Sequence, residues 1–237
     1  SSAASDVYKR QYMYRSIDLL KGSDNVRELA YLSTYYGDLS SYLNDSHRNG
    51  EAIKICRQRL DVIHRMSGMS GPPPGYIDQQ YGYLYSKLAW YYQQEGETRK
   101  AAEACRNYLA TAFSSSQVGQ VEIVPYLLHN HQYHEALQRL DNYAAIFQGA
   151  DTISYNYTTL LSHYAQAYRG LGNQQPANSY LQRIIHVNDH IYQREKASQA
   201  HEFAILYQTQ EKDMQIRETQ AELKRQYILF AAASLVA

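Results

Sequence analysis

Two stretches of this chain repeat the same order of apolar, small and turn-forming residues. In each, a large residue precedes a small one, an aromatic residue follows three positions later, and a glycine comes four after that. A small residue and an apolar one then follow at further spacings of five and four. Spacings of three and four residues predict helices, and the glycine between them predicts the turn of a helical hairpin. The first copy is Leu88, Ala89, Tyr92, Gly96, Ala101 and Cys105, and the second is Tyr164, Ala165, Tyr168, Gly172, Ala177 and Leu181.

Each residue type has a physical reason at its position in the hairpin. A small residue on the first helix lets the second helix approach closely, and the aromatic residue fills the space beside it. The small residue on the second helix is then the contact point of the returning chain. The pattern therefore predicts almost complete burial of four alanines: Ala89, Ala101, Ala165 and Ala177.

Weaker copies of the pattern extend it along most of the chain. One runs from Leu39 to Cys56, another from Ile123 to Leu140, and a last half-copy carries Ala204 and Tyr207. The small residue of the second helix stands at positions 52, 101, 136 and 177, which gives spacings of 49, 35 and 41. Unequal spacings predict longer helices or loops in places, and residues 71–75 (GPPPG) form an obvious break within the longest one.

The pattern resembles the tetratricopeptide repeat, a helical hairpin with a period of about 34 residues. This resemblance implies an all-α fold over residues 12–207, in which hairpins stack into a right-handed superhelix, or solenoid. Such arrays bind partners and rarely catalyse. The alternative is a helical bundle without repeats, in which the matching copies arise by chance.

Composition agrees with a helical scaffold and points to no nucleic-acid partner within this chain. The 23 basic residues balance the 23 acidic ones, so there is no basic footprint for a phosphate backbone. Tyrosine is abundant, with 25 residues against 4 Phe and 1 Trp. A tyrosine ring can fill a gap between helices while its hydroxyl stays in water, so we expect most of these tyrosines to be packing residues.

No catalytic, cofactor or metal site is predicted, and the chain is not expected to be an enzyme. The sequence has no GxSxG, GxxxxGK[ST] or HExxH motif. The histidines at 129, 131 and 134 straddle a predicted hairpin turn, and a surface cluster explains them better than a metal site. Cys56 and Cys105 lack CxxC spacing, and the sequence leaves open whether they pair.

A binding face follows from the geometry that the resemblance implies, because the first helix of each hairpin lines the groove of such arrays. The only tryptophan, Trp90, is the strongest candidate, since a half-exposed indole is a common recognition anchor. The expected ligand is a protein or peptide partner, or a small-molecule signal. The residues predicted to face the groove are Tyr83, Ser86, Trp90, Gln93, Thr159, Ser162, Gln166 and Arg169.

Both ends of the chain are set apart from the repeats. Residues 1–11 (SSAASDVYKRQ) resemble translated adapter sequence, so we expect a non-native leader there. No helix breaker occurs from Ile191 to the end, which predicts one long helix. Within it, residues 208–226 form a charged connector with a weak seven-residue pattern, compatible with a coiled coil. Residues 227–237 are uncharged and nearly all apolar, which predicts the start of a truncated transmembrane helix.

The connector carries a second resemblance. Residues 204–212 (AILYQTQEK), following degenerate repeats and preceding an apolar run, look like the sensor half of certain membrane signalling proteins of Bacteroidetes. The resemblance implies a sensing domain anchored in the inner membrane, with its repeats in the periplasm and a histidine kinase or helix-turn-helix output absent from this chain. It is also compatible with a homodimer through the connector. The alternative is a tail-anchored adaptor that binds protein partners without any signalling output.

Overall fold

A computed structural model describes the backbone of residues 3–236 and the side chains of residues 10–217, 219 and 220. All regular structure in that part of the chain is helical, as the repeat pattern predicts. In order, the helices are α1 (Ala3–Leu20), α2 (Val26–Asp45), α3 (Asn49–Ser67), α4 (Tyr76–Gln94), α5 (Thr98–Leu109), η1 (Ala112–Ser115), α6 (Gly119–Glu122), α7 (Val124–His129), α8 (Tyr133–Ala144), η2 (Ala145–Phe147), α9 (Tyr155–Gly170) and α10 (Gln174–Val236).

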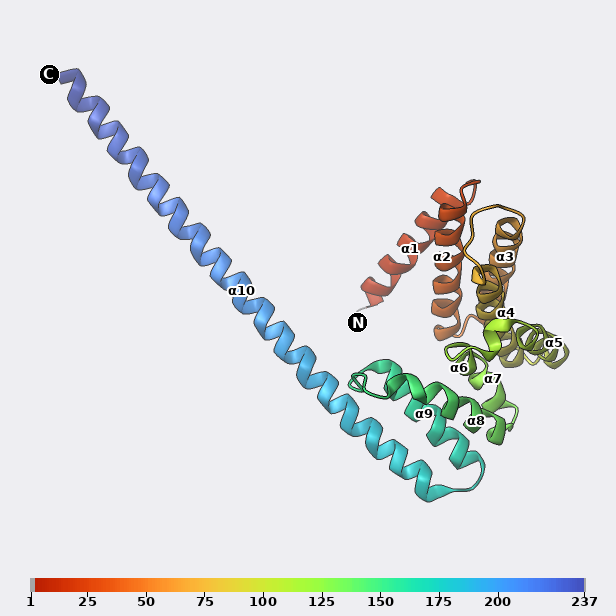
Figure 1. Ribbon diagram of the computed structural model, residues 1–237. Coiled ribbons are helices and arrows are strands. Elements are labelled where there is room, and N and C mark those ends of the chain that lie inside the picture. The colour runs from red at the N-terminus through yellow and green to blue at the C-terminus, as the bar shows by residue number, and fades with distance from the viewer. Residues whose placement is uncertain (1–2, 237) are drawn as a thin grey trace.

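Consecutive helices pack as antiparallel hairpins that follow one another along an arc (Figure 1). The pairs are α2 with α3, α4 with α5, α7 with α8, and α9 with the first part of α10. Helix α1 lies against α2, and α10 runs far beyond the packed part of the chain. These hairpins are the four that the sequence pattern predicts, and the expected all-α solenoid is confirmed.

The four hairpin turns share one backbone conformation. In each, the second residue after the helix is left-handed, with φ of 58° at His47, 73° at Gly96, 59° at His131 and 78° at Gly172. The next N–H donates back to a carbonyl on the last turn of the helix, as from Glu97 to Tyr92 (2.9 Å). This is the Schellman arrangement, which satisfies carbonyls that the helix end leaves unpaired. The corresponding bonds are Arg48 to Leu43, Gln132 to Leu127 and Asn173 to Tyr168.

The small residues of the pattern lie at the helix contacts. Ala89, Ala101 and Ala177 are completely buried, and Ala165 is 3 % exposed. Their predicted burial is therefore confirmed. The equivalent alanines of the two weaker copies, Ala52 and Ala136, are also completely buried, so those copies are real repeats with less regular spacing.

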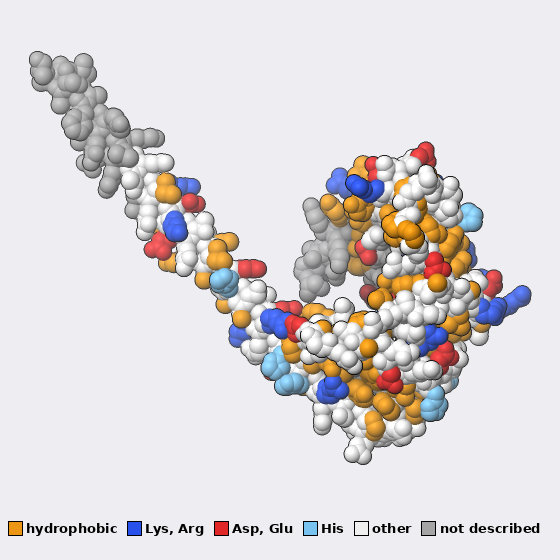
Figure 2. All heavy atoms as spheres, in the orientation of Figure 1, with side chains coloured by type: hydrophobic (Ala, Val, Ile, Leu, Met, Phe, Trp, Pro, Cys, Tyr) orange, Lys and Arg blue, Asp and Glu red, His pale blue; other side chains and the backbone are white. Residues whose placement is uncertain are grey.

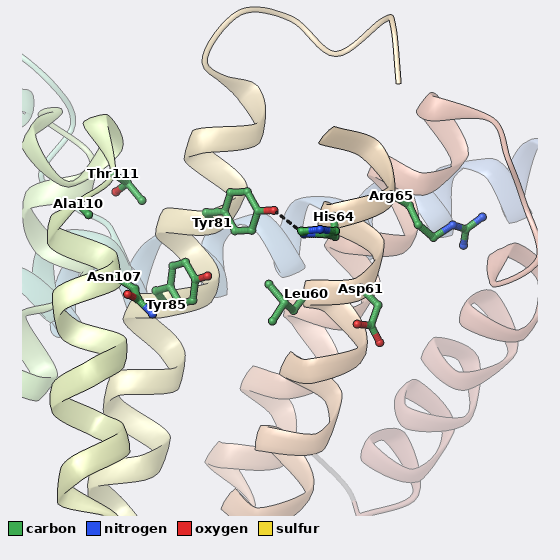
Figure 3. A pocket seen from close by; sticks show the side chains of 9 residues that line it. All are labelled: Leu60, Asp61, His64, Arg65, Tyr81, Tyr85, Asn107, Ala110 and Thr111. Atoms are coloured by element: carbon green, nitrogen blue, oxygen red, sulfur yellow. Dashed lines mark hydrogen bonds between the residues drawn. The ribbon is translucent and has the colours of Figure 1, made fainter. Parts of the chain in front are cut away.

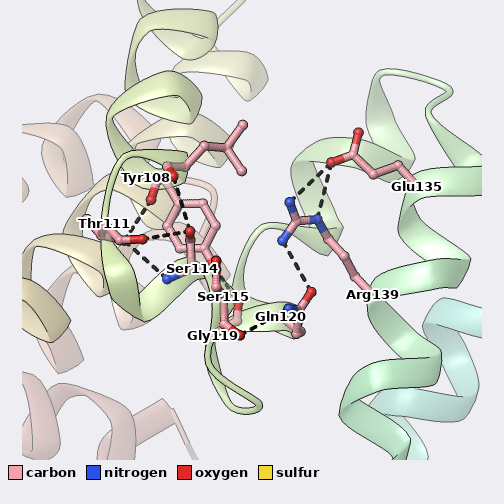
Figure 4. A network of polar contacts seen from close by, with 9 residues as sticks. Tyr108, Thr111, Ser114, Ser115, Gly119, Gln120, Glu135 and Arg139 are labelled. Carbon is pink, nitrogen blue, oxygen red and sulfur yellow. Dashed lines mark hydrogen bonds and ion pairs between the residues drawn. The ribbon is translucent and has the colours of Figure 1, made fainter.

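A network of polar contacts joins the second hairpin to the third (Figure 4). The buried Tyr108 hydroxyl donates to the carbonyl of Gly119, at the start of α6. Across from it, Arg139 of α8 pairs with Glu135 at 3.2 Å and donates to the Gln120 side chain at 3.5 Å. The network fixes the short helices η1 and α6 between two hairpins, where they replace part of a regular first helix.

Helix α10 packs only through its first third. Val187 and Ile191 are buried against Leu161 of α9, and the last contacts to the repeats are Arg194 with Asp151 (2.7 Å) and Glu195 with Tyr155 (2.9 Å). Every described side chain from residue 192 onward is exposed. The long unbroken helix is therefore confirmed, and Figure 2 shows it projecting from the packed body with charged and apolar side chains mixed along it.

The sequence also predicted a last half-copy of the repeat and a transmembrane segment in the C-terminal part of the chain. The last half-copy of the repeat is wrong, because Ala204 and Tyr207 lie on the exposed part of α10 and Tyr207 is 70 % exposed, with no second helix among the described residues to cover them. The side chains of residues 227–237 lie outside the described part of the chain. Among the described residues, no helix combines the length and apolar character needed to cross a bilayer. The boundaries expected after residues 11 and 207 fall inside α1 and α10.

Candidate binding site

Three of the residues predicted to face the groove meet in one pocket, which we call the Trp90 pocket. Trp90 comes from α4 of the second hairpin, and Gln166 and Arg169 come from α9 of the fourth. Helix α7 and the start of α8 close the space between them. The pocket has a volume of about 460 Å³, within the usual range for ligand sites. Its lining residues are Trp90, Pro125, Leu128, His129, Tyr133, His163, Gln166, Arg169 and Gly170.

Aromatic contacts fix the walls of the Trp90 pocket. The Trp90 indole meets the His129 ring edge to face, with centroids 5.7 Å apart and planes at 70°. On the other side, the Tyr133 ring lies directly on Gly170, where an added Cβ would come 2.1 Å from a ring carbon. The hydroxyl of Tyr133 also bonds Nδ1 of His131 at 2.6 Å. A glycine at position 170 is therefore what lets Tyr133 form this wall.

The charge in the Trp90 pocket is unbalanced. The Arg169 side chain is exposed and has no hydrogen bond or ion pair with any described residue, and no acidic side chain of the described residues lines the pocket. Gln166 is oriented by a hydrogen bond from its Nε2 to the hydroxyl of Ser162 (3.2 Å). The pocket thus presents one free guanidinium and an amide beside an aromatic wall, which suits an anionic or hydrogen-bond-accepting group.

His163 is a partly buried residue of the site with one buried ring nitrogen. Burial lowers the pKa of its imidazole from 6.5 to about 4, so the ring is neutral at pH 7. Its Nδ1 is buried without a hydrogen-bond partner among the described residues. A buried nitrogen without a partner weakens the fold, and such costs concentrate at functional sites.

The other predicted face residues do not reach the Trp90 pocket. Ser86 is only 1 % exposed and its hydroxyl bonds the carbonyl of Tyr83, so its prediction as a face residue is wrong. The reason is that neighbouring hairpins cover α4 on both sides. Tyr83 packs against the Phe113 ring with centroids 4.6 Å apart. Thr159 is exposed but away from the pocket, and Gln93 is half-buried with its Oε1 unpartnered among the described residues.

Sequence reasoning missed His163, Tyr133 and Gly170. Gly170 could have been noticed as a glycine within the helical pattern ahead of the expected turn glycine, Gly172. Nothing local to Tyr133 or His163 indicates that they converge, because they are 30 residues apart on helices of different hairpins.

Both cysteines are free thiols in this structure. Burial raises the pKa of Cys56 and of Cys105 to about 11, so neither is a reactive thiolate at neutral pH. In the described part of the chain, no group of three or more histidine, cysteine or acidic residues is placed to hold a metal ion. His131 instead occupies the left-handed position of a hairpin turn, and the His129 ring packs against Trp90 in the wall of the Trp90 pocket.

Comparisons with known proteins give only distant similarities. No family model and no curated protein matches this sequence. The solved structures similar to it include two crystal structures of nearly identical TPR-like repeats of a putative kinesin light chain from Podosopora anserina, one of them with a substitution. The substituted form is 16 % identical, with a TM-score of 0.48 over 80 % of this chain and 94 % of the other. The second is 16 % identical, with a TM-score of 0.45 over 78 % and 92 %. The identities and TM-scores are too low to support any conclusion about the Trp90 pocket, so the function of that pocket is argued from its own geometry.

Proposed function

We propose that this chain is a protein-interaction module that holds a peptide segment of a partner against the Trp90 pocket. The observation that carries the proposal is the meeting of Trp90 with Arg169, from hairpins about 80 residues apart in sequence, around a pocket that no described acidic side chain lines. Tryptophan, tyrosine and arginine are the residue types that dominate binding energy at protein interfaces.

The walls of the Trp90 pocket divide the recognition into two parts. Trp90, Pro125 and Leu128 offer an apolar surface for one large side chain of the partner. Arg169 at the rim offers a charge-assisted hydrogen bond to a carboxylate or a backbone carbonyl. The chain performs no chemistry on the bound segment.

The test begins with peptides selected from a random library on the whole chain. Fluorescence anisotropy then compares their affinity for the wild type and for Arg169→Ala. We expect affinity to fall about tenfold or more, because the variant removes the free guanidinium at the site. Arg99→Ala is the matched control, since Arg99 is exposed on α5 and away from the pocket. Equal binding by all three proteins would refute the proposal.

A second variant separates binding from folding. Trp90 is half-buried and packs against the core, so Trp90→Ala is expected to lower stability as well as affinity. Gln166 is exposed, and Gln166→Ala should therefore leave the melting temperature unchanged while weakening the selected peptides. Circular dichroism of each variant reports whether the helices remain.

We further propose that this module senses its ligand for a membrane-anchored signal transducer, with the repeats outside the cytoplasm and the anchor in the inner membrane. Two features support the proposal: α10 leaves the repeats after Glu195 and continues to Val236, and the sequence of residues 227–237 is uncharged. Ligand binding would shift the packing between hairpins and move α10, a population shift between two arrangements. A tail-anchored adaptor without output is the alternative.

The transducer proposal is tested on the full-length protein. It should fractionate with membranes. Met214 is 62 % exposed on α10, and a Met214→Cys variant should cross-link two copies with a yield that changes on adding a selected peptide. A soluble full-length protein would rule out the anchor. A yield that does not respond to peptide would leave the adaptor alternative.

A further inference from the structure

Helices α1 and α2 enclose a groove at the start of the solenoid, which we call the α1–α2 groove. Helix α1 lies against α2 (Figure 1), and the groove between them has a volume of about 640 Å³. One wall comes from α1, through Tyr12 and Met13. The opposite wall comes from the second half of α2, through Tyr35, Asp38, Ser41, Tyr42 and Asp45.

Tyrosine and aspartate alternate along the α2 wall of the groove. They follow one another at spacings of three, four and three residues: Tyr35, Asp38, Tyr42 and Asp45. At about 100° per residue, these spacings keep all four on one face of the helix, within about 80° of arc. Residues seven apart stand about 10 Å from each other along that face. The face of a tyrosine ring is electronegative and attracts cations, so the rings and the carboxylates favour the same kind of ligand.

The two carboxylates of the α1–α2 groove are not neutralised. Asp38 and Asp45 are exposed, and neither has a hydrogen bond or ion pair with any described residue. No basic side chain of the described residues lines the groove. The Lys87 ammonium of α4 donates to the Ser41 hydroxyl at 2.5 Å, and even with this lysine counted the groove keeps a net negative charge.

The position of Asp45 adds to the preference for a cation. Asp45 is the last residue of α2, and no basic residue stands in the last turn of that helix. The carbonyl end of a helix carries a partial negative charge, which disfavours a carboxylate and favours a cation. A cation bound beside Asp45 would therefore relieve a repulsion that the fold itself leaves in place.

We propose that the α1–α2 groove binds a segment of a partner protein through two arginines about 10 Å apart. A planar guanidinium stacks on an aromatic ring and pairs with a carboxylate in bidentate geometry, which an ammonium does not. The α2 wall offers this combination twice, once at each aspartate. In a polyproline II segment, residues three apart lie on one side and about 9 Å from each other, so that conformation matches the two positions. This site is separate from the Trp90 pocket and does not depend on it.

A second aromatic pocket, between α3, α4 and α5, offers a comparison within the same molecule (Figure 3). The rings of Tyr81 and Tyr85 are nearly parallel there, with centroids 5.9 Å apart. The Asp61 carboxylate lies on the Arg65 side of α3, turned away from these rings (Figure 3). That pocket therefore has tyrosine rings without a carboxylate beside them, and we do not expect it to bind arginine.

The experiment is an NMR titration of the whole chain near pH 7, where ordinary aspartates are ionised. The probe is a polyproline hexapeptide, blocked at both ends, with arginine at its second and fifth positions. We expect it to shift the ring signals of Tyr12, Tyr35 and Tyr42, saturating with a Kd on the order of 0.1–1 mM. The signals of Tyr81 and Tyr85 should stay in place.

Two control peptides separate charge from spacing. A peptide with citrulline at both positions has nearly the same shape and no charge, and it should bind at least about tenfold more weakly. A peptide with two adjacent arginines keeps the charge but presents them to one aspartate at a time, so it should bind about threefold more weakly. Equal binding of the arginine and citrulline peptides would overturn the proposal without any variant.

Variants assign the effect to the groove. Asp38→Asn and Asp45→Asn should each weaken binding of the arginine peptide at least about fivefold. Asp61→Asn is the matched control, since Asp61 is an exposed aspartate of α3 outside the groove, and it should leave binding unchanged. Shifts that survive the double variant of Asp38 and Asp45, or that fall on Tyr81 instead, would overturn the proposal.

Thermal unfolding of Asp45→Asn gives an independent readout. The substitution removes a negative charge from the carbonyl end of α2, so the melting temperature should stay the same or rise while peptide binding falls. A lower melting temperature would show that the fold itself needs the Asp45 carboxylate, and it would contradict a role in holding a partner.

Discussion

The guanidinium of Arg59 lies directly against the backbone of Gly37, where an added Cβ would come 2.9 Å from Nη1. Arg59 belongs to α3, is 5 % exposed, and reaches between α2 and α4. Its Nε donates to Ser33 (3.1 Å) and its Nη2 to Gln80 (3.0 Å). Among the described residues no carboxylate pairs with it, and burial lowers its pKa. The hydrogen bonds to two neighbouring helices, and the space left by glycine, accommodate this buried charge.

Gly37→Ala should therefore destabilise the first hairpin by about 1–3 kcal/mol, because the methyl group would overpack against a guanidinium held on two sides. Urea unfolding followed by circular dichroism measures the change. The control is Gly50→Ala, a helical glycine of α3 with nothing within 4 Å of the added Cβ. That substitution should stabilise the protein by about 0.4–1 kcal/mol. Equal changes in the free energy of unfolding for the two substitutions would show that the Arg59 side chain moves aside without a cost in stability.

The left-handed turns predict a pair of opposite effects. His47 occupies with φ of 58° the position that glycine holds with φ of 73° at Gly96. A side chain in this conformation costs about 1–2 kcal/mol. His47→Gly should thus raise the free energy of unfolding by about 1 kcal/mol, and Gly96→Ala should lower it by a similar amount. Thermal unfolding of both variants checks the signs, and a loss of stability in His47→Gly would contradict the shared turn geometry.

Overpacking tests the helix contact of the last hairpin. Ala165 of α9 is 3 % exposed and follows by one helical turn Leu161, which packs against α10. Ala165→Leu should lower the free energy of unfolding by about 1–3 kcal/mol, because no space exists for the larger side chain. Ala200→Leu is the control on exposed α10, and it should leave stability within about 0.5 kcal/mol of the wild type. A melting temperature of Ala165→Leu equal to or above the wild type would mean that the contact is loose.

His163 predicts a pH dependence of stability. Burial lowers its folded pKa to about 4, whereas the unfolded chain keeps the ordinary value near 6.5. Between these two pKa values the unfolded state binds a proton that the folded state does not. The contribution of the neutral His163 ring to the free energy of unfolding is therefore complete above about pH 6.5 and is lost as the pH falls towards 4. It amounts to at most about 3 kcal/mol.

The measurement compares urea unfolding of the wild type and His163→Gln from about pH 7.5 to about 3.5, a range that spans both pKa values. The difference between the two proteins isolates His163 from other titrating groups, such as Glu122, whose pKa burial raises. The stability of the variant should fall less on acidification. His201→Gln, on exposed α10, should follow the wild type. Parallel curves for His163→Gln and the wild type would place that imidazole in water.

The sequence by itself determined the hairpins. Their turns depend on residues within one stretch of chain: an apolar residue in the last turn of the helix, as at Tyr92 or Leu127, and a left-handed residue four positions later. Hydrogen bonds between near neighbours and the helical period are set locally, so spacing alone predicted the turns and the buried alanines. The unbroken course of α10 is local in the same sense, because nothing within it stops a helix.

Only the tertiary structure decided which faces are covered. Ser86 and Trp90 stand one helical turn apart on α4, yet one is buried and the other lines a pocket, because stacking against the next hairpins covers them unequally. The meeting of Trp90 with His163 and Arg169 depends on how α6 and α7 replace a regular first helix in the third hairpin. The angle between hairpins follows from the volumes of side chains far apart in the sequence. Because each contact between helices constrains the others, the angle between hairpins cannot be predicted from a local sequence pattern.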